Sequence, residues 1–229
     1  MDRRNFLASG LAATAAFTSI RPATVGAAES KTVRIVGVSC SPRAGKTTAK
    51  AVDAALTAAK GVDSRIKVEL IDLGGLDISG WVGGAQPDTP AIPEDDFDTF
   101  ILPKLKNPVP DGLIIGSPSY FRTMSSLCKA FLERIAVLRS PKLLLADKPV
   151  GVLAVGAYRN GGQELVIEQI QTAMLCHEVM IVGGKPGAHQ GATLWNNYGD
   201  DITKDEFGMD SARKLGIRIA EAALRLAQK

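Results

Sequence analysis

From residue 32 onward, short apolar runs alternate with longer segments in which apolar residues recur at helical spacing. The short runs are rich in β-branched residues, which is typical of strands buried in a parallel sheet. We predict strands over residues 32–39, 65–72, 112–117, 149–156 and 179–183, and helices over residues 47–61, 94–106, 126–138, 162–176 and 205–228. This alternation predicts an α/β domain with a doubly wound, five-stranded parallel sheet and helices on both faces.

Two features interrupt the alternation. Residues 74–93 are rich in Gly, Pro and Asp and predict a long loop. Loops of this length inside compact domains are uncommon and usually serve a function. Pro103 falls inside the predicted helix 94–106 and should kink or end it, because proline lacks the N–H that a helix interior requires.

The strongest local signal lies between the first strand and the first helix, over residues 39–48. The backbone N–H groups and the dipole of a helix start favour a phosphate group. The candidate phosphate-binding side chains supply hydroxyl donors and positive charge: Ser41, Arg43, Lys46, Thr47 and Thr48. Such a set of donors suits a terminal phosphate dianion.

Residues 40–47 also come close to the P-loop of nucleotide triphosphatases, G-x-x-x-x-G-K-[ST]. Cys40 stands where that motif requires its first glycine, and Pro42 stiffens the loop. No later strand offers an apolar run that ends in a magnesium-binding aspartate, and the third predicted strand runs into Gly-Ser-Pro. A triphosphatase is therefore a distant second interpretation.

Two further loops follow the third and fourth predicted strands and reach the same edge of the sheet, where ligands of doubly wound sheets bind. The candidate residues for contacts with a flat heterocycle are Pro118, Ser119, Tyr120, Phe121, Tyr158, Asn160 and Gly161. Glycines in the second of these loops let the backbone approach a ligand closely. One loop suited to phosphate and two loops suited to an aromatic ring predict a mononucleotide with a flat, fused ring.

With these motifs in this order, the chain resembles the NADPH-dependent FMN reductase group of flavodoxin-like proteins, and within it the iron–sulfur flavoproteins. The stretches that carry the resemblance are residues 39–48, 118–134, 156–163 and 204–220. The resemblance implies a flavodoxin-like fold and FMN as cofactor. It places the phosphate at Ser41, Arg43, Lys46 and Thr47, and the isoalloxazine at the two aromatic loops. It also implies a homodimer or homotetramer with the flavin near the subunit boundary.

The chain departs from the iron–sulfur branch in the loop over residues 74–93, which contains no cysteine. That branch carries its cluster-binding cysteines there, so we predict no cluster and no metal site. The chain's three cysteines, Cys40, Cys128 and Cys176, form no C-x-x-C pair. We expect free thiols, with one disulfide as the alternative if the protein is exported.

Residues 1–27 have the three parts of a secretory signal: a charged start, an apolar middle and a small-residue exit. Arg3 and Arg4, followed by Phe6 and Leu7, resemble the twin-arginine class. We therefore predict an exported, periplasmic protein, with residues 1–27 as the signal peptide and 28–229 as the FMN-binding domain. The apolar stretch is too short to span a membrane, so we predict no stable membrane anchor.

The formal net charge is +3, and the first 27 residues contribute +2 of it. The remaining 24 basic and 23 acidic residues give no electrostatic case for nucleic acid as a partner.

The sequence therefore predicts an FMN-dependent oxidoreductase that passes hydride or electrons from NAD(P)H, through the flavin, to a small quinone or flavin acceptor. Because NAD(P)H is not available outside the cytoplasm, a quinol or a redox protein is an alternative donor. A non-enzymatic electron carrier of the flavodoxin type is the alternative function, although such carriers tend to be strongly acidic. A protein that only stores or delivers flavin is a further alternative.

Overall fold

The structure is a computed structural model, and it describes residues 31–81 and 94–227. The predicted signal peptide over residues 1–27 lies outside the described residues, as do residues 82–93 of the predicted long loop. The part of the chain that begins at Lys31 forms one compact unit.

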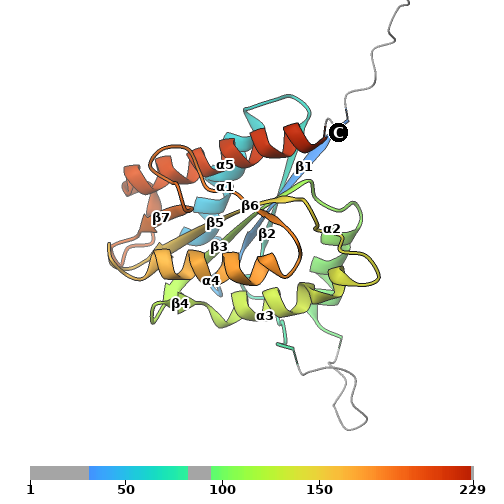
Figure 1. Cartoon of the computed structure of the whole chain (residues 1–229). Helices are drawn as coiled ribbons and strands as arrows, with labels where there is room; N and C mark the ends of the chain where they lie inside the picture. The colour runs from blue at the N-terminus through green and yellow to red at the C-terminus, as the bar shows by residue number, and fades with distance from the viewer. Residues whose placement is uncertain (1–30, 82–93, 228–229) are drawn as a thin grey trace, which may run out of the picture. The chain divides into compact units, whose positions relative to one another are not determined.

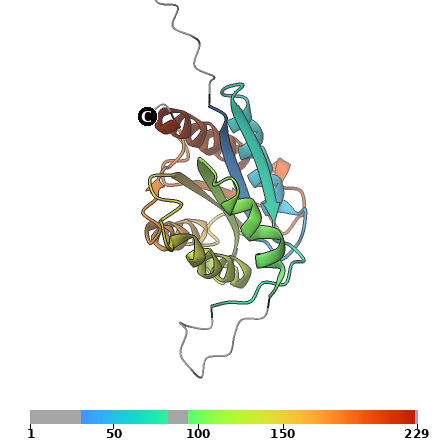
Figure 2. The ribbon, with the colours of Figure 1, turned by 90° about the vertical axis from the view of Figure 1, so that its right-hand side faces the viewer.

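A parallel sheet forms the centre of this unit, with the strand order β2-β1-β3-β5-β6 (Figure 1). Its strands are β1 (Val33–Ser39), β2 (Ile66–Asp72), β3 (Gly112–Tyr120), β5 (Pro149–Gly156), β6 (Met180–Ile181) and β7 (Ala192–Trp195). Figure 2 shows β1 and β2 side by side, and they pair in parallel over their whole length. The chain crosses from β2 past β1 to β3, so the side on which successive strands are added changes between β1 and β3. The predicted doubly wound α/β class is confirmed.

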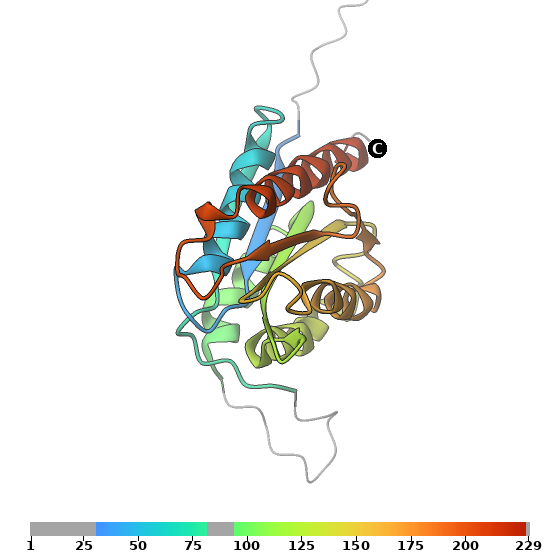
Figure 3. The same ribbon diagram turned by 90° about the vertical axis from the view of Figure 1, so that its left-hand side faces the viewer.

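Helices cover both faces of the sheet, and each face has its own buried hydrophobic cluster. The helices α1 (Thr47–Lys60) and α5 (Glu206–Ala227) cover one face (Figure 3). The helices α3 (Ser126–Arg134) and α4 (Gln163–Leu175) cover the other, together with the π-helical turn η1 (Phe97–Ile101) and the short α2 (Leu102–Lys106). Burial of apolar surface on both faces supplies the main stabilisation of such a layered domain.

The close approach of α1 and α5 depends on Gly216. A Cβ atom at this position would lie 1.9 Å from the backbone oxygen of Ala55 in α1. No real Cβ contact is that short, so only glycine allows the two helix backbones to pack at this distance.

The third strand is longer than the sequence predicts. The predicted strand ends at residue 117, but β3 continues through Pro118 to Tyr120 and then pairs antiparallel with β4 (Thr123–Met124). The carbonyl of Gly116 accepts a hydrogen bond from Cys40 on the β1 side, and the alternation of a strand directs the nitrogen of Pro118 to that same side. β1 pairs with β3 only as far as Gly116, so the missing N–H of Pro118 removes no ladder bond.

The fifth place in the sheet is shared by two short strands. The prediction of one strand over residues 179–183 is correct for β6 but misses β7. β6 pairs with the beginning of β5, at Pro149 and Val150, and β7 pairs with its end, from Leu153 to Gly156. The sheet edge is therefore completed by two segments that lie ten residues apart in the sequence.

Smaller differences concern the helices. The predicted helix 94–106 is the η1 turn followed by α2, with Pro103 in the first turn of α2, where its missing N–H is tolerated. The predicted helix 126–138 ends as α3 at Arg134 and continues as the 3-10 turn η2 (Ile135–Arg139). Among the helices that the structure describes, none has the length and apolar character required to cross a membrane.

Candidate functional site

The loop between β1 and α1 makes a tight turn at the carboxyl edge of the sheet. The hydroxyl of the buried Ser41 accepts a hydrogen bond from the backbone N–H of Arg43 at 3.2 Å. Gly45 has a φ of 66°, in the left-handed region, and its N–H donates to the carboxylate of Asp72 at the end of β2. The loop is thus held from two sides.

Helix α1 begins directly after this turn, with Lys46 as the capping residue. No side chain among the described residues caps the first turn of α1, so its N–H groups remain available for an anion. The side chains of Thr47 and Thr48 are both buried. The methyl group of Thr48 faces Gly116 of the sheet, and its hydroxyl has no hydrogen-bond partner among the described residues. The role of Thr48 as a phosphate contact stays a prediction.

The two cations of the loop converge on one carboxylate. Arg43 donates to Asp200 at 2.7 Å, and the amine of Lys46 lies 3.3 Å from the second oxygen of the same carboxylate. Hydrogen bonds from Arg43 and then from Lys46 lower the pKa of Asp200. Both cations are half-exposed, so they are available to an incoming anion.

The end of β3 and the loop after β5 are joined by a direct bond. The hydroxyl of Ser119 donates to the carbonyl of Gly161 at 2.6 Å. Pro118 is buried, whereas Tyr120 is exposed. Next along the chain, Phe121 is fully exposed and, like Arg122, has a positive φ. Two adjacent left-handed residues other than glycine are unusual and are held by the β3–β4 hairpin turn.

The loop between β5 and α4 carries the other predicted ring contacts. Tyr158 and Asn160 are exposed, and Gly161 accepts the bond from Ser119. The side-chain amide of Gln163 in α4 donates to the carbonyl of Tyr158 at 2.7 Å and so anchors the loop to the start of α4. The ring of Tyr158 meets that of Tyr198 edge-on, with 5.0 Å between the centroids. Hydrogen bonding with Tyr158 favours the neutral phenol of Tyr198 and so raises its pKa.

Trp195 supports this loop. Its indole N–H donates to the carbonyl of Ala157 at 2.8 Å, and the guanidinium of Arg159 lies over its ring at 4.5 Å. A cavity of about 370 Å³ is lined by Arg122, Arg159, Asn160 and the first residues of α4.

The structure thus places every predicted site residue at the carboxyl edge of the sheet. It brings the two aromatic loops into direct contact through Ser119 and Gly161. Residues 196–201 give a further connection to the phosphate loop, because Tyr198 contacts the loop after β5 and Asp200 contacts the phosphate loop.

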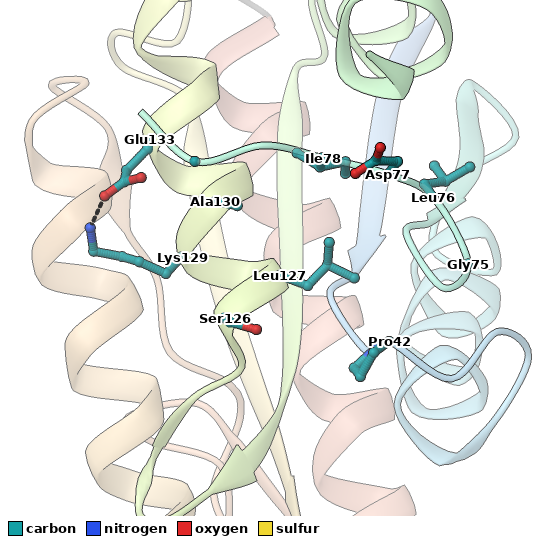
Figure 4. Close-up of a pocket in the computed structure, with 11 residues that line it drawn as sticks. Pro42, Gly75, Leu76, Asp77, Ile78, Ser126, Leu127, Lys129, Ala130 and Glu133 are labelled. Atoms are coloured by element: carbon teal, nitrogen blue, oxygen red, sulfur yellow. Dashed lines mark hydrogen bonds and ion pairs between the residues drawn. The ribbon is translucent and has the colours of Figure 1, made fainter. Parts of the chain in front are cut away.

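A further cavity of about 770 Å³ lies on the α3 side of the phosphate loop (Figure 4). Figure 4 shows Pro42 on one side of it and Leu127 and Ala130 of α3 on another, with the Lys129–Glu133 ion pair at the rim. Pro42 is the only contribution of the phosphate loop to this lining among the described residues. The cavity therefore lies next to the phosphate loop, but none of the predicted cofactor-binding residues lines it.

Residues 33–193 match the sequence profile of NADPH-dependent FMN reductase, which is more than half of the 229-residue chain. The chain belongs to this family. An iron–sulfur flavoprotein of Methanocaldococcus jannaschii is 37% identical over 194 residues, which is 82% of this chain and 96% of the relative. An NAD(P)H dehydrogenase (quinone) of Paracoccus denitrificans is 32% identical over 132 residues, covering 51% of this chain and 62% of the relative.

Among solved structures, a WrbA-like flavodoxin of Agrobacterium tumefaciens superposes with a TM-score of 0.55 at 15% identity. The superposition covers 85% of this chain and 99% of the other. It shows that the fold is flavodoxin-like, as the strand order also indicates.

Membership in the FMN reductase family establishes FMN as the cofactor and the protein as an FMN-dependent oxidoreductase. It decides against the triphosphatase suggested by residues 40–47. The donor set is consistent with the cofactor, because the phosphate loop offers two cations and free helix N–H groups. Exposed aromatic rings on the other two loops suit a flat heterocycle.

Because cysteine thiolates hold iron–sulfur clusters and one relative is an iron–sulfur flavoprotein, the positions of the cysteines matter. Cys40 and Cys128 are buried, and Cys176 is exposed at the end of α4. Burial, followed by the contact with Cys128, raises the pKa of Cys40 well above that of a free thiol. Three cysteines are fewer than the four thiolates that hold a Cys₄ cluster, so the absence of a cluster stays our prediction.

Sequence reasoning missed Asp200 and Tyr198 as neighbours of the site. Both belong to the polar run Asn196–Asp201, which carries no motif and follows a strand that was not predicted. Recognition of β7 would have placed this run at the same edge of the sheet.

Proposed function

We propose that this protein oxidises NAD(P)H and reduces a small quinone or flavin, with FMN as the carrier between them. The observation that carries the proposal is the bond between Ser119 and Gly161, which joins the loops of the exposed Tyr120 and Tyr158 at the same sheet edge as the cationic phosphate loop. FMN, when bound, supplies the redox chemistry by taking two electrons from a donor and giving them to an acceptor.

The protein's own residues bind the flavin and orient its ring. In the proposed arrangement, Arg43 and Lys46 hold the flavin phosphate, together with the N–H groups of the first turn of α1. Tyr120 and Tyr158 flank the isoalloxazine, and the backbone of Asn160 and Gly161 contacts its edge. The rigid β3 hairpin and the amide of Gln163 keep these loops in place.

The name of the Paracoccus relative, NAD(P)H dehydrogenase (quinone), supports this donor and acceptor. The site needs no acid–base side chain, because the flavin carries the reaction. The proposed assembly is a homodimer or homotetramer.

We further propose that the protein is exported by the twin-arginine pathway, which moves folded proteins with their cofactor in place. Export separates the protein from cytoplasmic NAD(P)H, so a quinol or a redox protein is the alternative donor. This alternative rests on Arg3, Arg4 and the apolar stretch behind them.

The test is an absorbance spectrum of the purified full-length protein, followed by anaerobic addition of NADPH and then of a soluble quinone. We expect flavin bands that bleach with NADPH and return with the quinone. Bands that persist with NADPH but bleach with a quinol would mean that a quinol, and not NADPH, is the electron donor. Bands that bleach with NADPH but do not return with the quinone or with free flavin would overturn the proposed acceptors.

A further inference from the structure

Asp200 forms ion pairs with both cations of the phosphate loop, Arg43 and Lys46. Its two carboxylate oxygens lie 2.7 Å from Arg43 and 3.3 Å from the amine of Lys46. Asp200 belongs to the segment between β7 and α5, which is 154 or more residues away along the chain. The contact is therefore a product of the tertiary fold and not of local sequence.

These are the same cations that the proposed function assigns to the flavin phosphate. A phosphate dianion and the Asp200 carboxylate cannot both lie between them without strong repulsion. The ion pairs of Asp200 are about half-exposed on both sides, and exposed pairs of this kind are weak. A phosphate that also gains the N–H groups of α1 makes stronger, charge-assisted bonds and can replace the carboxylate.

The backbone around Asp200 holds the carboxylate near the loop. The N–H of Asn196 donates to the carbonyl of Gly156 at 3.0 Å, so the segment is anchored to the end of β5. Asn197 and Tyr198 both have positive φ values, and the ring of Tyr198 packs against Tyr158. The segment thus touches the predicted ring-binding loop at one point and the phosphate loop at another.

We propose that Asp200 is a built-in competitor of the flavin phosphate, which pairs with Arg43 and Lys46 before FMN binds and releases them to the phosphate. Asp200 then sets how strongly the protein prefers the phosphorylated flavin over riboflavin. The inference rests on the proposed position of the phosphate at the β1–α1 loop.

The test compares FMN with riboflavin, because the two ligands share the ring and differ in the phosphate. The full-length protein is stripped of flavin, and the dissociation constant of each ligand is measured from the quenching of flavin fluorescence. In the variant Asp200→Asn we expect the preference for FMN to rise about three- to tenfold, while riboflavin binding stays unchanged. An unchanged or smaller preference overturns the proposal, and a smaller one would mean that Asp200 positions the cations.

Two further variants separate the possible failures. Asp210→Asn removes an exposed carboxylate that pairs with Lys214 on α5, and it should leave the preference unchanged. Arg43→Met should lower the preference for FMN. If Arg43→Met lowers it and Asp200→Asn has no effect, the phosphate position stands and only the competition is wrong. If the wild-type protein binds both flavins equally, the phosphate position and the competition both fail.

Discussion

The hydroxyl of Ser119 at the end of β3 donates to the carbonyl of Gly161 in the loop after β5, over a distance of 2.6 Å. This bond joins two segments that lie 42 residues apart and carry most of the predicted ring contacts. Gly162, the next residue, packs so closely on Arg122 that a Cβ atom there would lie 2.8 Å from the Cα atom of Arg122. The two loops therefore form one rigid surface at the edge of the sheet.

The Ser119–Gly161 bond predicts the effect of Ser119→Ala on cofactor binding. Loss of one hydrogen bond of this kind removes about 0.5–1.5 kcal/mol, so we expect the dissociation constant of FMN to rise about two- to tenfold. Titration of the flavin-stripped protein with FMN, followed by fluorescence, measures it. Ser64 is exposed in the turn before β2, and Ser64→Ala serves as the matched control. Equal affinities of both variants and wild type would show that the bond does not support the site.

Close helix packing predicts that Gly216→Ala destabilises the fold. The new Cβ atom would lie 1.9 Å from the oxygen of Ala55, and overpacking of this kind costs about 1–3 kcal/mol. Denaturant unfolding measures the loss. Gly61 is the control, because its φ is −71° and a Cβ atom there meets its nearest neighbour at an ordinary 3.5 Å. Gly61→Ala should be neutral or slightly stabilising, and equal losses in both variants would contradict the packing argument.

His177 predicts a pH dependence of stability. Burial, and then the charge of Arg139, lower its pKa in the folded protein below the ordinary value of about 6.5. Below that ordinary value the unfolded chain takes up a proton that the folded protein resists. The free energy of unfolding should therefore fall with pH from about 6.5 downward, by at most about 1.4 kcal/mol per pH unit from this one group.

The variant His177→Gln lacks this titration and should show a shallower loss of stability between about pH 7 and pH 5. Chemical denaturation at a series of pH values compares the two proteins. Parallel curves for wild type and variant would mean that His177 does not contribute.

The export proposal predicts that the two N-terminal arginines control localisation. In a bacterial host with a twin-arginine pathway, the wild-type protein should reach the periplasm and Arg3→Lys combined with Arg4→Lys should remain in the cytoplasm. Cell fractionation and immunoblotting measure the distribution. Arg21→Lys, outside the motif, is the matched control and should be exported normally. Export of the double variant would exclude the twin-arginine route.

The alternation of apolar runs and helical segments was enough to predict the fold class. Four of the five predicted strands correspond to β1, β2, β3 and β5, because each is rich in apolar or β-branched residues and is flanked by polar or glycine residues. The fifth place was only half predicted, since β7 is four residues long and no local pattern distinguishes it from the loops around it. Pairing with β5, a tertiary contact, makes it a strand.

Pro118 shows a second limit of local reasoning. Proline usually ends a strand, but here β1 stops before it, and the nitrogen of Pro118 faces a side without a partner. Only the relative lengths of neighbouring strands reveal this, and a single sequence does not contain them.

The candidate site was predicted to the level of its three loops, because each loop directly follows a recognisable strand. The sequence did not predict that Arg43 and Lys46 share Asp200, because that pairing depends on the path of the chain after β7. It also did not predict that Thr48 turns its side chain toward Gly116. Side-chain direction at a helix start depends on packing against the sheet.

The interrupted fifth strand has a consequence for behaviour in solution. A long, continuous edge strand presents a row of unpaired N–H and C=O groups, which other chains can extend into an aggregate. Here that edge consists of β6 with two residues and β7 with four, separated by residues 182–191. The opposite edge is β2, which carries the charged side chains of Lys67 and Glu69. Both borders of the sheet thus discourage intermolecular strand pairing, and any association between copies of this chain should use its helices and loops.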